Sequence, residues 1–165
     1  MDPLSIRAMQ SKDDAQQCAA IMATTEPWIT LGRSFDDCLA VVADESREVY
    51  IAWDADHIAG FIIINMHGAF TGYIQTVCVD PEWRSRGVGS QLLQYAEDRI
   101  FSESPNAFLC VSSFNPRALQ LYERHGYRVV GELEDYLVTG HSEILMRKSI
   151  GPIHDYRKRK QRQDA

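Results

Sequence analysis

Apolar and polar residues follow two different periods along the chain, and the change of period predicts the elements. Apolar residues recur at helical spacing from Ala15 to Met22, and every four residues from Val88 to Ile100. β-Branched and aromatic residues predict strands elsewhere, and the unbroken apolar run 61–64 is typical of a strand covered on both faces. The predicted order is a strand at 5–8, helices around 15–22 and 35–43, strands at 48–53, 58–65 and 72–79, a helix at 88–101, a strand at 107–113, a helix at 116–125, and strands at 127–137 and 142–150.

The stretch from 72 to 113 predicts a strand, a long crossover helix and a second strand, so these two strands should be parallel. Their carboxyl ends should splay and leave a crevice for a ligand. The remaining strands are expected to form antiparallel hairpins. The predicted fold class is therefore mixed α/β, with a mostly antiparallel twisted sheet, one parallel pair and helices on both faces. No repeat or linker divides the chain, so we expect one domain over 1–153 and a basic, flexible tail over 154–165.

Composition narrows the classes of function. The 165 residues carry 45% hydrophobic residues and a formal net charge of -6, which suits one globular domain and gives no overall attraction for nucleic acid. The basic run 157–162 is the exception. It is either a solvated end of the chain or a docking tail for RNA or an acidic protein.

The cysteines and the apolar runs bear on location. Cys18, Cys38, Cys78 and Cys110 show no CxxC or other metal-ligand spacing, so we expect reduced, mostly buried thiols and no metal. The first residues lack a basic region followed by an apolar run, and no apolar stretch approaches the roughly 20 residues that cross a bilayer. We therefore expect a cytoplasmic protein without a membrane partner.

The loop 79–89 lies between a predicted strand and the long helix, and it carries the clearest chemical pattern. The first N–H groups of that helix have no helical partner, and they lie at the positive end of the helix dipole. Gly87 and Gly89 allow a phosphate to approach the backbone, and Arg84 and Arg86 add cationic groups. The spacing is neither GxGxxG nor GxxxxGK[ST], which favours a pyrophosphate without a metal-bound triphosphate. An ordinary turn with solvated arginines is the alternative.

Two motifs in order resemble a known family. Arg84-x-x-Gly87-x-Gly89 is similar to the coenzyme A pyrophosphate motif of the GNAT superfamily of N-acetyltransferases, and the segment 115–127 is similar to its N-x-x-A-x-x-x-Y-x-x-x-G-F/Y pattern. The resemblance covers roughly residues 5–150 and implies a GNAT-like fold with acetyl-coenzyme A as cofactor. The cofactor-binding residues that it implies are Cys78, Val79, Arg84, Arg86, Gly87, Val88, Gly89, Ser90, Asn115 and Tyr122.

The resemblance also implies a reaction, the direct transfer of an acetyl group to a primary amine through a tetrahedral intermediate. Tyr122 would protonate the departing thiolate, and Asn115 would hydrogen-bond the pantetheine arm or order the loop. Backbone N–H groups around Cys78 and Val79 would stabilise the oxyanion. A covalent route through Cys78 or Cys110 is disfavoured, because thiols inside apolar strands are usually inert.

The acceptor side is less defined. An amine arrives mostly protonated, since a lysine amine has a pKa of about 10.4 and an α-amine of about 8, so a base must remove a proton. Some relatives that acetylate protein N-termini carry a glutamate where this chain has Cys110, which leaves the base and an N-terminal acceptor open. Glu26 is the first candidate for the catalytic base, and His141 is another. The expected acceptor-binding residues are Glu26, Trp28, Asp135, Tyr136 and His141.

Several alternatives stay open. Protein amines, polyamines, amino acids and drug-like amines all remain open as acceptors, and the acidic composition favours a cationic one. The domain could instead sense acetyl-coenzyme A without catalysis, or serve as an adaptor that docks through its basic tail. Uncovered edge strands would allow a homodimer.

Overall fold

The computed structural model describes residues 4–164, and in that part of the chain seven strands form one sheet in the order β1-β2-β3-β4-β5-β7-β6. Only the β4–β5 pair is parallel. No helix in these residues is long and apolar enough to cross a membrane. The elements are β1 Ser5–Ala8, α1 Lys12–Ala23, α2 Phe35–Val42, β2 Glu48–Asp54, β3 His57–Asn65, β4 Tyr73–Val79, a 3-10 turn Pro81–Trp83, α3 Val88–Phe101, β5 Asn106–Ser112, α4 Pro116–Arg124, β6 Arg128–Leu133, β7 Glu143–Ser149 and α5 Ile153–Gln163.

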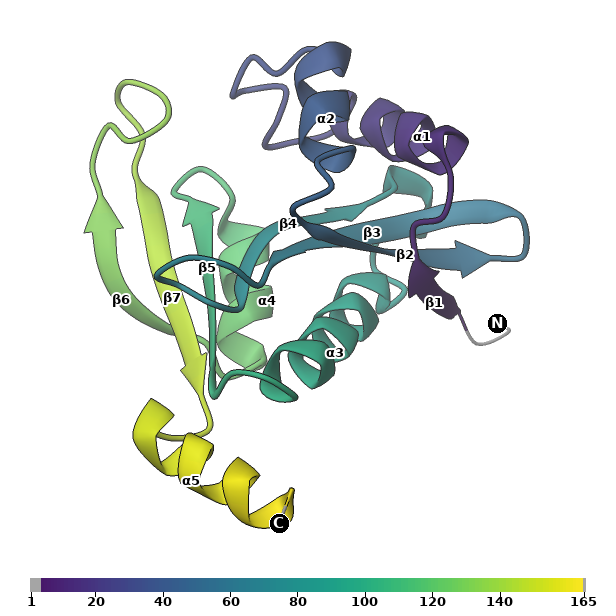
Figure 1. Cartoon of the computed structure of the whole chain (residues 1–165). Helices are drawn as coiled ribbons and strands as arrows, with labels where there is room; N and C mark the ends of the chain where they lie inside the picture. The colour runs from purple at the N-terminus through teal and green to yellow at the C-terminus, as the bar shows by residue number, and fades with distance from the viewer. Residues whose placement is uncertain (1–3, 165) are drawn as a thin grey trace.

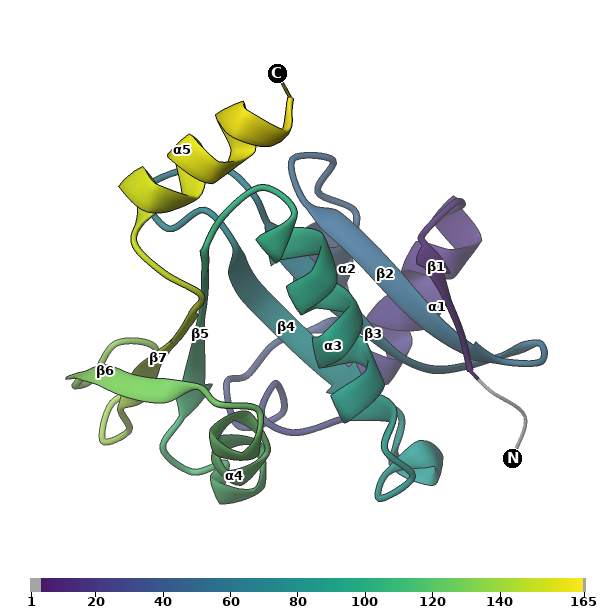
Figure 2. The same cartoon turned by 90° about the horizontal axis from the view of Figure 1, so that it is seen from below.

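Helices cover both faces of the sheet. Figure 1 shows α1 and α2 on one side and α3 on the other, and Figure 2 shows α3 and α4 together in front of the sheet. The central strand β3 is apolar on both faces, since Ile62 and Ile64 pack on the α3 side while Phe61 and Ile63 pack on the α1 side. This explains the unbroken apolar run. The predicted mixed sheet with one parallel pair and helices on both faces is confirmed.

A β-bulge in β4 opens the sheet. Thr76 pairs with Ile63 and Ile74 pairs with Ile64, so Gln75 is an extra residue on β4. A bulge bends its strand and increases the local twist. The parallel pairing of β4 with β5 covers only Tyr73↔Phe108 and Ile74↔Leu109, and it stops where the bulge begins. The carboxyl ends of the two strands therefore separate.

Gly72 holds the other end of this pair together. Its carbonyl accepts a hydrogen bond from Phe108 N–H at 3.0 Å, at the start of β4. Its φ is +88°, and a Cβ there would lie 2.5 Å from the carbonyl oxygen of Asn106. Only glycine fits this conformation and this close approach. The strands are thus joined at one end and open at the other.

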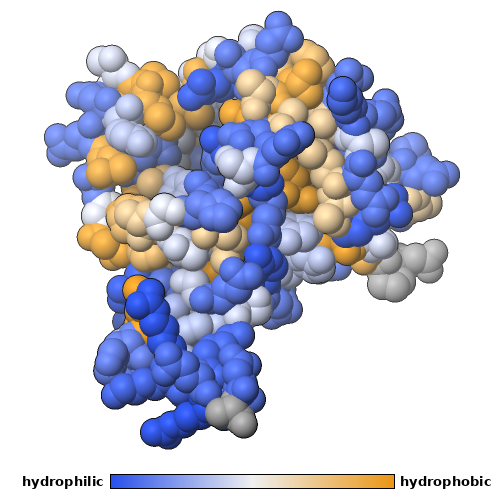
Figure 3. Space-filling model, viewed as in Figure 1, coloured by the Kyte–Doolittle hydropathy of each residue, from blue (hydrophilic) through white to orange (hydrophobic). Residues whose placement is uncertain are grey.

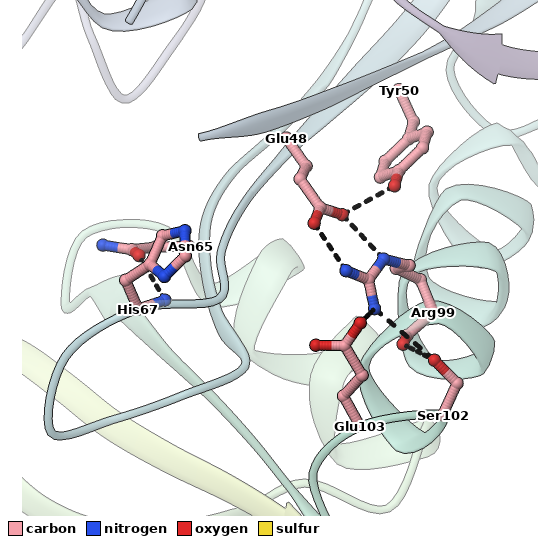
Figure 4. Close-up of polar contacts among 7 residues, drawn as sticks. All are labelled: Glu48, Tyr50, Asn65, His67, Arg99, Ser102 and Glu103. Atoms are coloured by element: carbon pink, nitrogen blue, oxygen red, sulfur yellow. Dashed lines mark hydrogen bonds and ion pairs between the residues drawn. The ribbon is translucent and has the colours of Figure 1, made fainter. Parts of the chain in front are cut away.

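Ion pairs fasten α3 to the sheet. The guanidinium of Arg99 donates to both carboxylate oxygens of Glu48 on β2, at 2.6 and 2.8 Å, and it also contacts Glu103 at 2.9 Å (Figure 4). The hydroxyl of Tyr50 donates to the same Glu48 at 2.6 Å. Although burial acts to raise it, these hydrogen bonds hold the pKa of Glu48 below its usual value.

The C-terminal segment differs from the flexible tail that the sequence predicts, because residues 153–163 form α5. Tyr156 on this helix is buried, and its hydroxyl donates to the carbonyl of Phe101 at 2.7 Å. Lys160 and Arg162 lie in the last turn, where the helix dipole favours positive charge. The rest of the helix is exposed and strongly hydrophilic (Figure 3). A single aromatic anchor among charged residues is too weak a periodic signal to predict this helix.

The Lys148–Glu97 pair offers a test of the packing of α3 on β7. Glu97 is 2% exposed, and its Oε2 lies 2.6 Å from Nζ of Lys148. Lys148→Met should lower the free energy of unfolding by about 3 kcal/mol, because it leaves a buried carboxylate without its cation. The double variant Glu97→Leu/Lys148→Met should regain most of that loss in urea denaturation. A double variant as unstable as the single one would contradict this.

Candidate active site

The chain leaves β4 and enters α3 through a turn that exposes helix amides. Gly87 is the N-cap residue of α3 with φ +81°, a left-handed conformation that favours glycine, and no side chain caps the helix. The first helical bond back to Gly87 comes from Gln91 N–H, at 3.1 Å. The N–H groups of the first turn, from Val88 to Ser90, therefore lack helical partners and point to the end of the helix. A helix end with free N–H groups is suited to bind an anion.

The start of α3, at Gly87, Gly89 and Ser90, lines a cavity of about 390 Å³, which we call the phosphate cavity. Its lining includes Arg84, Arg117 and Arg124, and Glu26 is the one carboxylate among the described residues that line it. Arg117 Nη2 donates to Ser85 Oγ at 2.7 Å, which links α4 to the loop before α3. The excess of positive charge from these arginines attracts phosphate groups. The lining of the phosphate cavity also includes Val77, Val79, Gly87, Gly89, Ser90 and Asn115.

The open edge of β4 presents backbone amides to the crevice. Asp80 N–H donates to the carbonyl of Ala59 on β3 at 3.0 Å. Because backbone groups alternate sides along a strand, the amide of Cys78 also points to β3. The amides of Val77 and Val79 point the other way, to the side from which β5 has separated. Arg84 Nε donates to the Val79 carbonyl at 3.4 Å, which agrees with that orientation.

Tyr122 lies on α4 beside the crevice. Asn115 starts this helix, and its Oδ1 accepts from Ala118 N–H at 3.2 Å. Tyr122 is 7% exposed, and its ring meets the ring of Tyr127 edge-on with centroids 6.0 Å apart. Burial raises the pKa of Tyr122 above the usual value for tyrosine, so its hydroxyl keeps its proton at neutral pH.

A second cavity, of about 360 Å³, lies on the α1–α2 side, and we call it the acceptor cavity. Its walls include Glu26 and Trp28 from the loop between α1 and α2, Tyr73 from β4, Cys110 from β5 and Glu143 from β7. The two cavities meet. The residues that line both are Glu26, Trp28, Val77, Asn115, Ala118 and Tyr122.

The model of the acetyltransferase (GNAT) family matches residues 13–127. This chain belongs to that family. Over 158 residues it is 28% identical to the N-alpha-acetyltransferase RimI of Mycobacterium tuberculosis, a match that covers 91% of this chain and 95% of that protein.

Solved structures share the fold of this GNAT chain. An aminoglycoside 6'-N-acetyltransferase complexed with coenzyme A superposes with a TM-score of 0.74 at 21% identity, covering 90% of this chain and 98% of that one. The ribosomal-protein-S18-alanine N-acetyltransferase of Escherichia coli gives 0.72 at 20% identity, covering 91% and 96%. The GNAT chain is thus an acyltransferase whose cofactor is acetyl-coenzyme A. The free amides and the arginines of the phosphate cavity fit the pyrophosphate of that cofactor.

The structure separates the predicted cofactor residues into two groups. Arg86, Val88 and Cys78 do not line the phosphate cavity: Arg86 lies 5.9 Å from the ring centre of Trp83, and Val88 and Cys78 are 1% exposed in the two cores. The amide of Cys78 is also directed to β3, so only Val79 of that predicted pair faces the crevice. The residues that do line the cavity are Val79, Arg84, Gly87, Gly89, Ser90, Asn115 and Tyr122.

The predicted acceptor residues divide in the same way. Glu26, Trp28 and Tyr136 line the acceptor cavity. Asp135 does not line it. Its φ is +50°, and its Oδ1 accepts from Gly140 N–H at 2.6 Å within the turn that follows β6. β6 itself ends at Leu133, four residues earlier than predicted. His141 lies outside as well, edge-on to Phe114 at 4.9 Å.

Some residues that line the two cavities are not among the predicted site residues. Arg117, Leu121 and Arg124 lie at helical i, i+4 and i+7 spacing, so the pattern of α4 does indicate a shared face on the phosphate cavity. Glu143 carries no such signal. It enters the acceptor cavity because β7 pairs with β5, a contact between residues 31 positions apart.

Gly89 gives a direct test of the phosphate cavity. A Cβ at Gly89 would lie 3.2 Å from Leu121 Cδ2, so a glutamate must extend into the cavity and repel the pyrophosphate. Gly89→Glu should weaken acetyl-coenzyme A binding by about 100-fold or more in calorimetry, which corresponds to about 3 kcal/mol. Gly131→Glu is the matched control, because that position on β6 has open space. Equal affinity in the two variants would place the cofactor elsewhere.

Proposed function

We propose that this enzyme transfers the acetyl group of acetyl-coenzyme A directly to a primary amine through a tetrahedral intermediate. The observation that supports this most is the meeting of the two cavities along Tyr122 and Val77. Cofactor and acceptor can therefore reach the same point from opposite sides of the sheet edge. A protein that only sensed the cofactor would need the phosphate cavity alone.

The residues around that point supply the chemistry. Acetyl-coenzyme A brings a thioester whose carbonyl carbon is open to attack. The outward amides of Val77 and Val79 are donors for the oxyanion, and they lie on the side of β4 from which β5 has separated. Tyr122 holds the proton that the departing thiolate takes up, and its raised pKa keeps that proton available. Asn115 orders the start of α4 and lies where the two cavities join.

The acceptor enters past the loop between α1 and α2. Glu26 lines both cavities, and its Oε2 accepts from Thr30 N–H at 3.1 Å, which holds the carboxylate in place beside Trp28. This position supports Glu26 as a contact for the incoming amine. The names of the relatives RimI and aminoglycoside 6'-N-acetyltransferase make a peptide α-amine and an aminoglycoside the first acceptors to test. A lysine ε-amine and spermidine complete the panel.

Tyr122→Phe tests the reaction. Loss of the acid should lower kcat by about 100-fold with the best acceptor, within the range usual for proton transfer by a side chain. The affinity for acetyl-coenzyme A should stay within a few-fold, because the ring is retained. Stopped-time assays of released thiol and calorimetry measure the two quantities.

Tyr127→Phe is the control for Tyr122→Phe. Tyr127 is equally buried and touches the Tyr122 ring, yet it lines neither cavity. It should keep near-normal kcat. If Tyr122→Phe matched Tyr127→Phe in rate, Tyr122 would not be the acid. If acetyl-coenzyme A bound but no amine of the panel were acetylated, the transferase proposal itself would fail.

A further inference from the structure

Glu143 is a buried carboxylate in the wall of the acceptor cavity. It is the first residue of β7 and pairs with Ser112 of β5, whose Oγ donates to Glu143 Oε1 at 2.5 Å. Its exposed fraction is 5%. A carboxylate with so little exposed surface needs compensation, since burial disfavours the charged form.

The other buried carboxylate within residues 4–164, Glu97, shows what compensation looks like. Glu97 is paired with the ammonium of Lys148 at 2.6 Å. Glu143 differs, because no lysine, arginine or histidine nitrogen within residues 4–164 forms an ion pair with it. Its hydrogen bond comes from a neutral hydroxyl. A cation that arrives in the acceptor cavity would complete the site.

We propose that Glu143 binds the acceptor as a primary ammonium and takes its proton, an inference that rests on the transferase function proposed above. The ammonium nitrogen gives one proton to the Glu143 carboxylate and regains its lone pair. The nitrogen then bonds to the acetyl carbonyl carbon, the carbon–sulfur bond breaks, and the thiolate takes the proton of Tyr122. The second proton lost by the nitrogen returns to the tyrosinate, and Glu143 releases its own proton to solvent.

The lining of the cavity selects the class of acceptor. The cavity lining holds three carboxylates, Glu26, Asp37 and Glu143. Arg33 is the one cationic side chain among the described residues of the lining, so the cavity carries an excess of negative charge. An amine with a carboxylate on the adjacent carbon would bring a second anion beside Glu143. We therefore expect amines without that neighbour, such as a lysine side chain, a peptide N-terminus or a polyamine, and we expect free amino acids to be poor acceptors.

The protonation of Glu143 links this role to pH. Burial raises the pKa of the carboxyl, and the hydrogen bond from Ser112 opposes that rise. Glu143 accepts a proton only when ionised, so kcat/KM should rise with pH through its pKa. Other groups around the cavity can titrate or carry charge: Tyr73 of β4, Cys110 of β5, Tyr136 before β7, and Glu26, Arg33 and Asp37 from the α1–α2 side.

The experiment compares Glu143→Gln, Ser112→Ala and the wild type with the fastest amine of the panel. Glu143→Gln should lower kcat/KM at pH 7 by about 100-fold or more. The loss should shrink toward pH 10, where a larger share of the amine is already neutral. Ser112→Ala removes a bond that lowers the pKa, so the acidic limb of its profile should move to higher pH. Calorimetry with coenzyme A bound and no acetyl group present should show weaker amine binding to Glu143→Gln.

Controls separate the ways in which this could fail. Glu132→Gln, an exposed carboxylate on β6 outside both cavities, should behave as the wild type. Acetyl-coenzyme A affinity, measured for each variant, reports on folding and on the cofactor site. Active wild type with a Glu143→Gln variant within about 3-fold of it across pH would overturn the role of Glu143 and leave the transferase function standing. Wild type that binds the cofactor but acetylates no amine would overturn the function first.

Discussion

The β-bulge at Gln75 is the feature on which the rest of the site depends. Two parallel strands normally satisfy each other's backbone along their whole length. Here β4 and β5 pair only at Tyr73 and Ile74, and the extra residue bends β4 away immediately afterwards. The separation leaves the amides of Val77 and Val79 without a strand partner. It also makes room for a cavity on each side of the open edge.

Contacts of α3 with the sheet support that opening. α3 is tied to β2 by the Arg99–Glu48 pair and to β7 by the Glu97–Lys148 pair, so the helix whose amides face the phosphate cavity is held from two sides. α4 lies on the far side of the crevice and brings Tyr122 to the line where the cavities meet. The arrangement lets one sheet edge serve both substrates. In the proposed reaction, backbone groups of β4 would receive the thioester, and side chains of β5, β7 and the α1–α2 loop would surround the amine.

The sequence predicted local features well and distant ones poorly. The turn before α3 depends on the conformation of Gly87, and the start of α4 depends on capping by Asn115. Short segments determine both features by themselves. The sequence pattern could not indicate the bulge, because an extra residue in an apolar strand leaves little trace. The place of Glu143 depends on pairing between β5 and β7. The ability of an imidazole to exchange a proton near neutral pH predicts His141 as a base or an acceptor contact, yet its ring packs on Phe114 outside the acceptor cavity.

Amide hydrogen exchange by NMR tests the open edge of β4 most directly. In the free protein, the amides of Val77 and Val79 should exchange much faster than those of Thr76 and Cys78, which point to β3. Saturation with acetyl-coenzyme A should slow exchange at Val77 and Val79 and leave the other two unchanged. Equal protection of all four amides in the free protein, or no change at Val77 and Val79 on binding, would contradict the account.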